Sequence, residues 1–205
     1  PSNMISRLLV DFYKEWGTQF HIEYHEGSVE EITDHVHQGI SEIGIVYVAL
    51  KQVQTFQHIL THKNLEFVPQ DVKKICVYVG PNHPLYHTES IDFEDLSSLK
   101  FMRGVRDFFS MEHHLERVSM GVIDNEKLHH VVYTNSDHLI IDLLLHSDVC
   151  SLGLDFMHEP YTQYAIKSLP INGCEPFLQM GYVFNPERAL SAQARWVVER
   201  FRKML

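Results

Sequence analysis

The 205-residue chain has no run of the roughly 18 to 20 apolar residues that a membrane-spanning helix needs, and we expect no signal peptide before Pro1. It has only three cysteines, Cys76, Cys150 and Cys174. Their wide spacing indicates neither a disulfide framework nor a zinc knuckle. These absences argue against a membrane protein and against a disulfide-rich secreted domain. We therefore expect a cytoplasmic protein that makes no contact with a membrane.

Basic residues are also scarce: 17 Lys and Arg face 27 Asp and Glu, so the net charge is −10 with the histidines neutral. Nucleic-acid binding depends on neutralising phosphates, so this chain is a poor DNA ligand by itself. The hydrophobic fraction of 44% is that of a globular protein and excludes the disordered and fibrous classes. If the protein acts on DNA, another segment makes the contacts.

The common catalytic and metal-binding motifs are missing. No glycine-rich phosphate loop follows a predicted strand, and no Gly-x-Ser-x-Gly elbow occurs. The 15 histidines include no His-Glu-x-x-His pair, and neighbours such as His113 and His114 face apart. We expect no metal, no cofactor and no enzymatic activity. The histidines are interpreted as a polar surface that titrates near pH ~6.5.

Apolar spacing and cap residues divide the chain into alternating helices and strands. The predicted helices cover residues 4–16, 28–39, 110–119, 136–146 and 191–205. The predicted strands cover residues 20–24, 43–49, 65–68, 75–79, 101–102, 128–133, 149–152, 165–169 and 177–184. This order predicts an α/β architecture with mostly parallel strands, and its repetition after about residue 75 predicts two lobes.

Small hydroxyl or amide residues stand at several predicted helix N-termini, directly after strands. In doubly wound sheets these strand ends form the crevice where ligands bind, and helix N-termini favour anions. Two arginines in a strand-to-helix loop could add charge-assisted hydrogen bonds to such an anion. The alternative is that each residue is only a satisfied cap or a solvent-facing arginine. The predicted ligand-binding residues are Ser2, Asn3, Ser28, Arg103, Gly104, Val105, Arg106, Thr134, Asn135 and Ser136.

Four phrases, in their order and spacing, resemble the effector-binding domain of LysR-type transcriptional regulators. They are LLVDFYKEWGTQFHIEYHEGSVEEITDHVHQGISEIGIVYV, LEFVPQDVKKICVYVGPNHPLY, IDFEDLSSLKFM and TNSDHLIIDLLLHSDVCSLGL. The sequence departs from the family pattern at Glu42, where an aspartate is usual. It also departs at His146-Ser-Asp148, where a glycine-rich turn is usual, and at Gly153, where proline is usual.

The resemblance implies two Rossmann-like lobes joined by two crossovers, as in type 2 periplasmic binding proteins. The first lobe would contain residues 1–74 and 177–205, and the second residues 75–176. A small effector, which we expect to be anionic, would bind in the interlobe cleft. It would change DNA binding by a winged helix-turn-helix domain that, with its linker helix, is absent from this chain.

The resemblance also implies a homodimer or tetramer built on the helices of residues 4–16 and 137–146. Promoter DNA would be contacted only through the N-terminal domain. Two alternatives stay open on the residues: a solute-binding protein of a transporter and, with less support, an enzyme built on the same fold. A helix-turn-helix region in the full-length product would indicate the regulator, whereas a signal peptide would indicate the transporter component.

Overall fold

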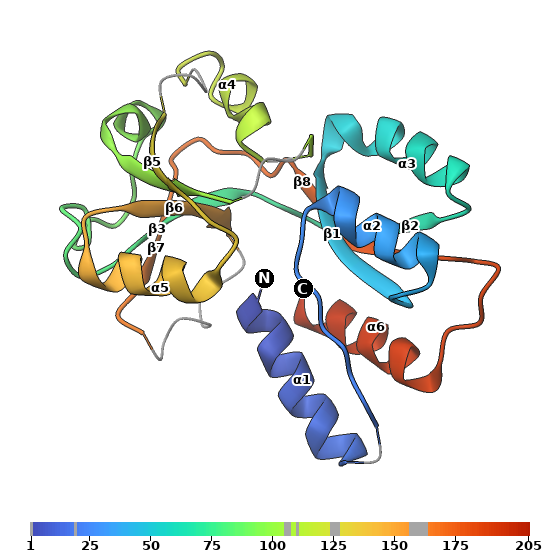
Figure 1. Ribbon diagram of the computed structural model, residues 1–205. Coiled ribbons are helices and arrows are strands. Elements are labelled where there is room, and N and C mark those ends of the chain that lie inside the picture. The colour runs from blue at the N-terminus through green and yellow to red at the C-terminus, as the bar shows by residue number, and fades with distance from the viewer. Residues whose placement is uncertain (1, 19, 105–107, 110, 124–127, 156–163) are drawn as a thin grey trace. The chain divides into compact units, whose positions relative to one another are not determined.

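The computed structural model describes residues 2–18, 20–104, 108–109, 111–123, 128–155 and 164–205. The chain forms two compact units: unit 1 comprises Pro1–Val72 and Gln179–Leu205, and unit 2 comprises Lys73–Leu178. Each unit has its own sheet with helices packed on it (Figure 1). The predicted α/β class is therefore confirmed. None of the helices in the described part is long and apolar enough to cross a membrane.

Unit 1 is built on a three-stranded sheet in the order β1-β8-β2. Its elements are α1 (Ser2–Trp16), α2 (Val29–Gln38), β1 (Ile43–Ala49), α3 (Val53–His62), β2 (Glu66–Lys73), β8 (Leu178–Phe184) and α6 (Ala192–Met204). Helices α2 and α3 pack on β1, while α1 packs against α6 (Figure 1). The rings of Phe12 and Trp196 meet edge to face across α1 and α6, with centroids 5.4 Å apart.

Cap residues set three of the helix ends of unit 1. Ser28 and Ser191 are the N-caps of α2 and α6, as predicted. Gly39 ends α2 with a φ of 76°, a left-handed conformation that glycine adopts without a steric penalty. Helix α1 begins at Ser2, earlier than predicted. Ser2 and Asn3 therefore lie inside its first turn and do not cap it from outside.

The strand predicted over residues 20–24 is wrong, because residues 20–28 form no regular secondary structure. Phe20, Ile22 and Tyr24 alternate with polar residues, yet they are 39%, 43% and 46% exposed. Alternation stabilises a strand only where a neighbouring strand pairs with it, and the β1-β8-β2 sheet does not include this segment. The ring of Phe20 instead packs edge-on against Trp16.

Helix α3 was not predicted, although its buried side chains Phe56 and Leu60 have helical spacing. It follows a 3-10 turn, Leu50–Gln52, and its N-cap Gln52 makes no side-chain capping bond. The usual polar signal for a helix start is therefore absent, which explains why the sequence pattern gave no helix here.

Unit 2 is built on a five-stranded sheet in the order β5-β4-β6-β3-β7. Its elements are β3 (Ile75–Val79), β4 (Lys100–Arg103), α4 (Leu115–Val118), β5 (His129–Tyr133), α5 (Asp137–His146), β6 (Cys150–Leu154) and β7 (Lys167–Pro170). Strand β4 runs parallel to β5 and β6, but β3 runs antiparallel to β6 and β7. The sheet is therefore mixed, which corrects the expectation of mostly parallel strands.

The helix predicted over residues 110–119 is divided into a 3-10 turn, Met111–His114, and the short helix α4. Its expected cap, Ser110, lies outside the described residues. A further 3-10 segment, Phe93–Ser98, precedes β4. Its N-cap Asp92 forms a capping box with Asp95, as expected for a carboxylate at a helix start.

Helix α5 packs on the sheet of unit 2 through an apolar cluster. Gly80 permits a close approach, because a Cβ atom there would lie 1.6 Å from the carbonyl oxygen of Leu144. The buried members of the cluster are Cys76, Tyr78, Met102, Leu144 and Val149, with Val132, Ile140, Leu143 and Ile166 packed against them.

All three cysteines are free and buried. Burial raises the pKa of the Cys76 thiol to about 12 and also raises the pKa of Cys150 and Cys174. A thiolate is therefore almost absent from these residues at neutral pH.

Candidate functional site

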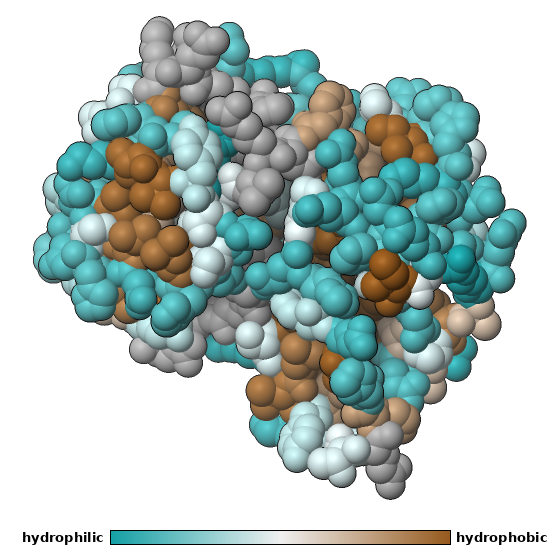
Figure 2. All heavy atoms as spheres, viewed as in Figure 1, coloured by the Kyte–Doolittle hydropathy of each residue, from teal (hydrophilic) through white to brown (hydrophobic). Residues whose placement is uncertain are grey.

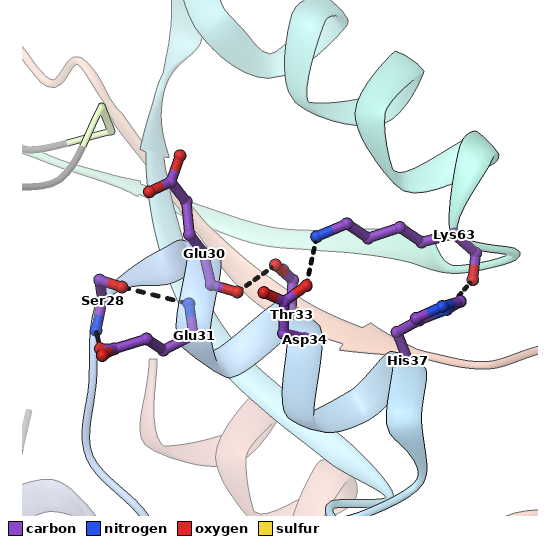
Figure 3. A network of polar contacts seen from close by, with 7 residues as sticks. All are labelled: Ser28, Glu30, Glu31, Thr33, Asp34, His37 and Lys63. Carbon is purple, nitrogen blue, oxygen red and sulfur yellow. Dashed lines mark hydrogen bonds and ion pairs between the residues drawn. The ribbon is translucent and has the colours of Figure 1, made fainter.

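The N-terminus of α2 is closed by a complete capping box (Figure 3). The backbone N–H of Glu31 donates to Ser28 Oγ over 3.1 Å, and the backbone N–H of Ser28 donates to Glu31 Oε2 over 2.8 Å. These hydrogen bonds hold the pKa of Glu31 below its usual range. A carboxylate thus already occupies the positive end of this helix, and it would repel a second anion there.

A second set of contacts ties α2 to the end of α3 (Figure 3). Lys63, the C-cap of α3, places its Nζ 2.5 Å from Asp34 Oδ1. The Nδ1 atom of His37 lies 2.7 Å from the carbonyl oxygen of Lys63. These contacts fix α2 and α3 against each other.

The predicted site residues of unit 2 come together at the carboxyl ends of β4 and β5. Arg103, the last residue of β4, pairs with Tyr133, the last residue of β5. The backbone N–H of Thr134 donates to the Arg103 carbonyl oxygen over 2.9 Å. Thr134 Oγ1 accepts from the N–H of Ser136 over 3.0 Å, and Ser136 Oγ caps α5 by accepting from the N–H of Leu139 over 3.3 Å.

The Arg103 side chain contains an unpaired donor. Its Nε atom is buried, and none of the described residues accepts a hydrogen bond from it. A buried donor without an acceptor costs free energy, and such a group calls for a missing partner. The adjacent Gly104 has open space where a side chain would start, with no atom within 4 Å of a Cβ built there.

Strand alternation places Arg103 on the sheet face opposite Met102, whose side chain belongs to the cluster under α5. Arg103 and the α5 N-terminus therefore reach the same edge of the sheet from its two faces. The sequence pattern did not single out Tyr133, which lies beside Arg103 and is 53% exposed. Its position as the last residue of a predicted strand could have indicated that it lies at the ligand-binding edge of the sheet.

Five other predicted positions have different outcomes. Val105 and Arg106 lie outside the described residues, and so do the side chains of Ser2 and Asn3. Asn135 is exposed in the turn between β5 and α5. The structure thus brings together Arg103, Gly104 and residues 134–136 in unit 2, and it places Ser28 in unit 1.

Glu42, where the sequence departs from the family pattern, caps α6. The backbone N–H of Ser191 donates to Glu42 Oε2 over 2.8 Å, and Ser191 Oγ donates to Glu42 Oε1 over 2.9 Å. This carboxylate therefore has a structural role that sequence reasoning did not assign. Within the described ranges, no group of three or more His, Cys, Asp or Glu side chains could hold a metal ion.

Comparisons with known proteins match this architecture. The family model of the LysR substrate binding domain matches residues 2–205. The effector binding domain of QuiR in complex with shikimate is 16% identical, with a TM-score of 0.66, over 97% of this chain and 88% of that chain. The oxidized form of OxyR is 15% identical, with a TM-score of 0.61, over 98% of this chain and 89% of that chain. Full-length CbnR complexed with its target DNA is 12% identical, with a TM-score of 0.61, over 98% of this chain and 65% of that chain. No curated protein matches the sequence.

The chain belongs to the LysR substrate-binding domain family, since the family model covers nearly its whole length. It is a small-molecule-sensing regulatory domain of the kind found in LysR-type transcriptional regulators. The structural neighbours share its fold at low sequence identity. The resemblance inferred from the four sequence phrases is therefore confirmed.

Proposed function

We propose that this domain recognises a small carboxylate through Arg103, and that binding changes how the whole regulator holds promoter DNA. The DNA contacts would come from a helix-turn-helix domain elsewhere in the protein. The charge of −10 supports this division, because this chain lacks the basic surface that phosphate binding needs. The match to CbnR, solved with its target DNA, covers 65% of that chain and supports the same division. Like other LysR-type regulators, the protein would act in the cytoplasm and without catalysis.

The observation that carries the carboxylate assignment is the buried, unpaired Nε of Arg103. A guanidinium group matches a carboxylate with two parallel hydrogen bonds, and these charge-assisted bonds are stronger than neutral ones. The N-terminus of α5 reaches the same sheet edge and adds partial positive charge. QuiR, which has the same fold, was solved with shikimate, itself a carboxylate.

Ser28 would contact a different part of the effector. Its Oγ accepts from Glu31, so the hydroxyl hydrogen remains available as a donor. Because the Glu31 carboxylate stands beside it, an uncharged hydroxyl or carbonyl oxygen is a better partner for Ser28 than an anion. We therefore assign the charged end of the effector to unit 2 and an uncharged oxygen to Ser28.

The test is a thermal-shift screen of the purified chain with shikimate, benzoate and malate, each compared with its neutral methyl ester. A carboxylate present at 100 times its Kd adds about 2.7 kcal/mol of stability. We expect Arg103→Gln to abolish that gain and Arg103→Lys to retain part of it. Without ligand, Arg103→Gln should be no less stable, because it removes the unpaired Nε. Stabilisation by the esters but by none of the acids would overturn the carboxylate assignment.

We also propose that α1 and α5 provide the surfaces through which the domain oligomerises. Val10 and Tyr13 of α1 are 52% and 60% exposed, and Leu139 of α5 is 41% exposed. Brown apolar areas follow both helices in Figure 2. In α5 only Leu144 is buried, although most of the helix is apolar. Light scattering should show a dimer or tetramer that Leu139→Glu converts to a monomer, whereas a monomeric parent chain would remove the proposal.

Two other functions fit the fold alone: a solute-binding protein of a transporter, and an enzyme. The family match favours the regulator over both. Stabilising compounds from the screen should be recovered chemically unchanged after prolonged incubation with the chain, as measured by mass spectrometry. Conversion of any of them would instead support an enzyme.

A further inference from the structure

His58 and His62 lie one turn apart on the exposed side of α3. Their Nε2 atoms are 3.3 Å apart, and their ring centroids are 4.7 Å apart with the planes at 87°. Residues four apart on a helix share one face, so the backbone itself brings these rings together. The pair does not stand out in the sequence, because the sequence pattern predicted no helix over these residues.

The spacing of the two nitrogens suits a shared metal ion. A zinc–imidazole bond is about 2.0–2.1 Å long, so two such bonds at a tetrahedral angle place their nitrogens about 3.3–3.4 Å apart. We propose that His58 and His62 form a two-histidine site for Zn²⁺, Ni²⁺ or Cu²⁺, with water completing the coordination. Imidazole nitrogen is a preferred ligand of these late first-row cations.

The electrostatic surroundings favour a cation at this position. His62 is the last residue of α3, where the unpaired carbonyl groups give the helix its negative end. The nearby positive charge of Lys63 is directed to Asp34 of α2, which neutralises it (Figure 3). The one cationic side chain next to the pair in sequence is thus held in an ion pair with another helix.

In the metal-free chain the two imidazoles contact each other through their Nε2 atoms, which are 3.3 Å apart. Neither ring has another hydrogen-bond partner among the described residues, so no second shell fixes their orientation. The site should therefore bind reversibly, with Cu²⁺ bound more tightly than Ni²⁺ or Zn²⁺, and with no response to Mg²⁺.

Other histidines could also bind metal, so the test must identify the residues. His21 and His25 lie 3.4 and 3.6 Å from Glu23 and are the first residues to compare, although with Glu23 they do not form a group that could hold a metal ion. Untagged chain is titrated with Zn²⁺ by calorimetry at pH 7.5. In parallel, diethyl pyrocarbonate labelling with mass spectrometry reads each histidine. We expect Zn²⁺ to protect His58 and His62 together.

His58→Gln and His62→Gln should each weaken the tightest Zn²⁺ site by at least about tenfold, because even the loss of an outer-shell partner costs about 10- to 100-fold in metal affinity. His138→Gln, on the exposed face of α5, is the matched control and should leave this site unchanged. The double variant Gln54→His, His62→Gln moves the pair back by one turn on the same helix and should restore binding. Unchanged titration of both single variants, or unprotected labelling of His58 and His62, would overturn the site. Neither result depends on the effector or on Arg103.

Discussion

The two units differ in which groups lie at their helix N-termini. In unit 1, Glu31 closes the start of α2 and Glu42 closes the start of α6, so each positive helix end already faces a carboxylate of the chain. In unit 2, α5 is capped by the neutral Ser136, and the buried Nε of the nearby Arg103 has no acceptor among the residues that the structure describes. No described residue hydrogen-bonds the carboxylate of Asp137, the first residue of α5.

This difference shows that two helix N-termini with the same sequence signal can differ in how well they attract an anion. Both begin with a serine after an extended segment, and both serines accept a backbone hydrogen bond. What separates them is the residue three places on, Glu31 in α2 and Leu139 in α5. At α2 an external anion meets the Glu31 carboxylate, whereas near α5 the acidic Asp137 is accompanied by the positively charged Arg103, whose buried Nε has no acceptor among the described residues. This difference favours unit 2 as the anion-binding half.

The largest expected effect on stability comes from removing the carboxylate of Glu42, which contacts the N-cap of α6 in unit 1. Glu42→Ala removes two charge-assisted hydrogen bonds to the N-cap Ser191, so the free energy of unfolding should fall by about 2 kcal/mol in urea titrations. Glu42→Gln keeps an acceptor and should lose less. Equal stability of Glu42→Ala and the parent chain would show that this helix end is not held by the carboxylate.

The two capping serines provide a direct comparison. Ser28→Ala and Ser136→Ala should each cost about 1 kcal/mol of stability, because each removes one hydroxyl acceptor, while the backbone N–H of residue 28 can still donate to Glu31. Their effects on ligand response should differ in kind. Ser136→Ala should change the stabilisation by carboxylates and the stabilisation by their esters equally, because it acts only by weakening the fold. Ser28→Ala should in addition remove one uncharged contact with the ligand. Urea unfolding with and without each ligand measures both quantities.

Unit 2 also contains a buried histidine that should make it sensitive to acid. His83 is 4% exposed, its Nδ1 accepts from the N–H of Leu85, and burial holds its pKa below the usual value, with Asp148 opposing the shift. His83 therefore binds a proton more readily in the unfolded chain than in the folded one. The stability that depends on neutral His83 is present above about pH 6.5 and is lost as the pH falls towards the lower folded pKa.

The replacement His83→Asn keeps an acceptor for the N–H of Leu85 but cannot titrate. The variant should lose less stability than the parent chain between pH 7.5 and pH 5.5 in urea titrations. The exposed histidines contribute equally to both proteins, so the difference isolates His83. An identical pH dependence in the two proteins would remove His83 as its source.

The smallest expected effect on stability comes from Glu31→Gln, because glutamine also serves in a capping box. Removing the carboxylate should nevertheless make the α2 N-terminus attractive to anions. If Ser28 contacts an uncharged part of the effector, carboxylate affinity should rise only slightly through reduced repulsion. A large gain, measured by calorimetry, would instead place the effector's charged end beside Ser28 and reverse the assignment of the two units.

The sequence predicted the helices that begin with a polar cap. Ser28, Ser136 and Ser191 each accept a hydrogen bond from a backbone N–H three residues further on, so the signal for the helix start is local in sequence. It failed where structure depends on partners distant in the chain. Alternation at residues 20–24 could not reveal that no strand would pair there. The antiparallel direction of β3 likewise follows from tertiary pairing.

The same limit applies to the candidate site. Arg103 and Thr134 could be proposed as neighbours, since the ends of parallel strands share one sheet edge. Whether Arg103 Nε has an acceptor depends on every atom around it. A local sequence pattern therefore cannot show that no described residue accepts a hydrogen bond from it. The role of Glu42 was missed for the same reason, because its partner Ser191 is far away in the sequence.

The buried thiols have a practical consequence. Since Cys76, Cys150 and Cys174 are inaccessible and their pKa values are raised, a cysteine introduced on the surface would be the one that maleimide dyes label at neutral pH. One such position in each unit would allow fluorescence energy transfer to follow effector-induced motion without first removing the native cysteines. The same chemistry predicts that peroxide leaves the three thiols unmodified.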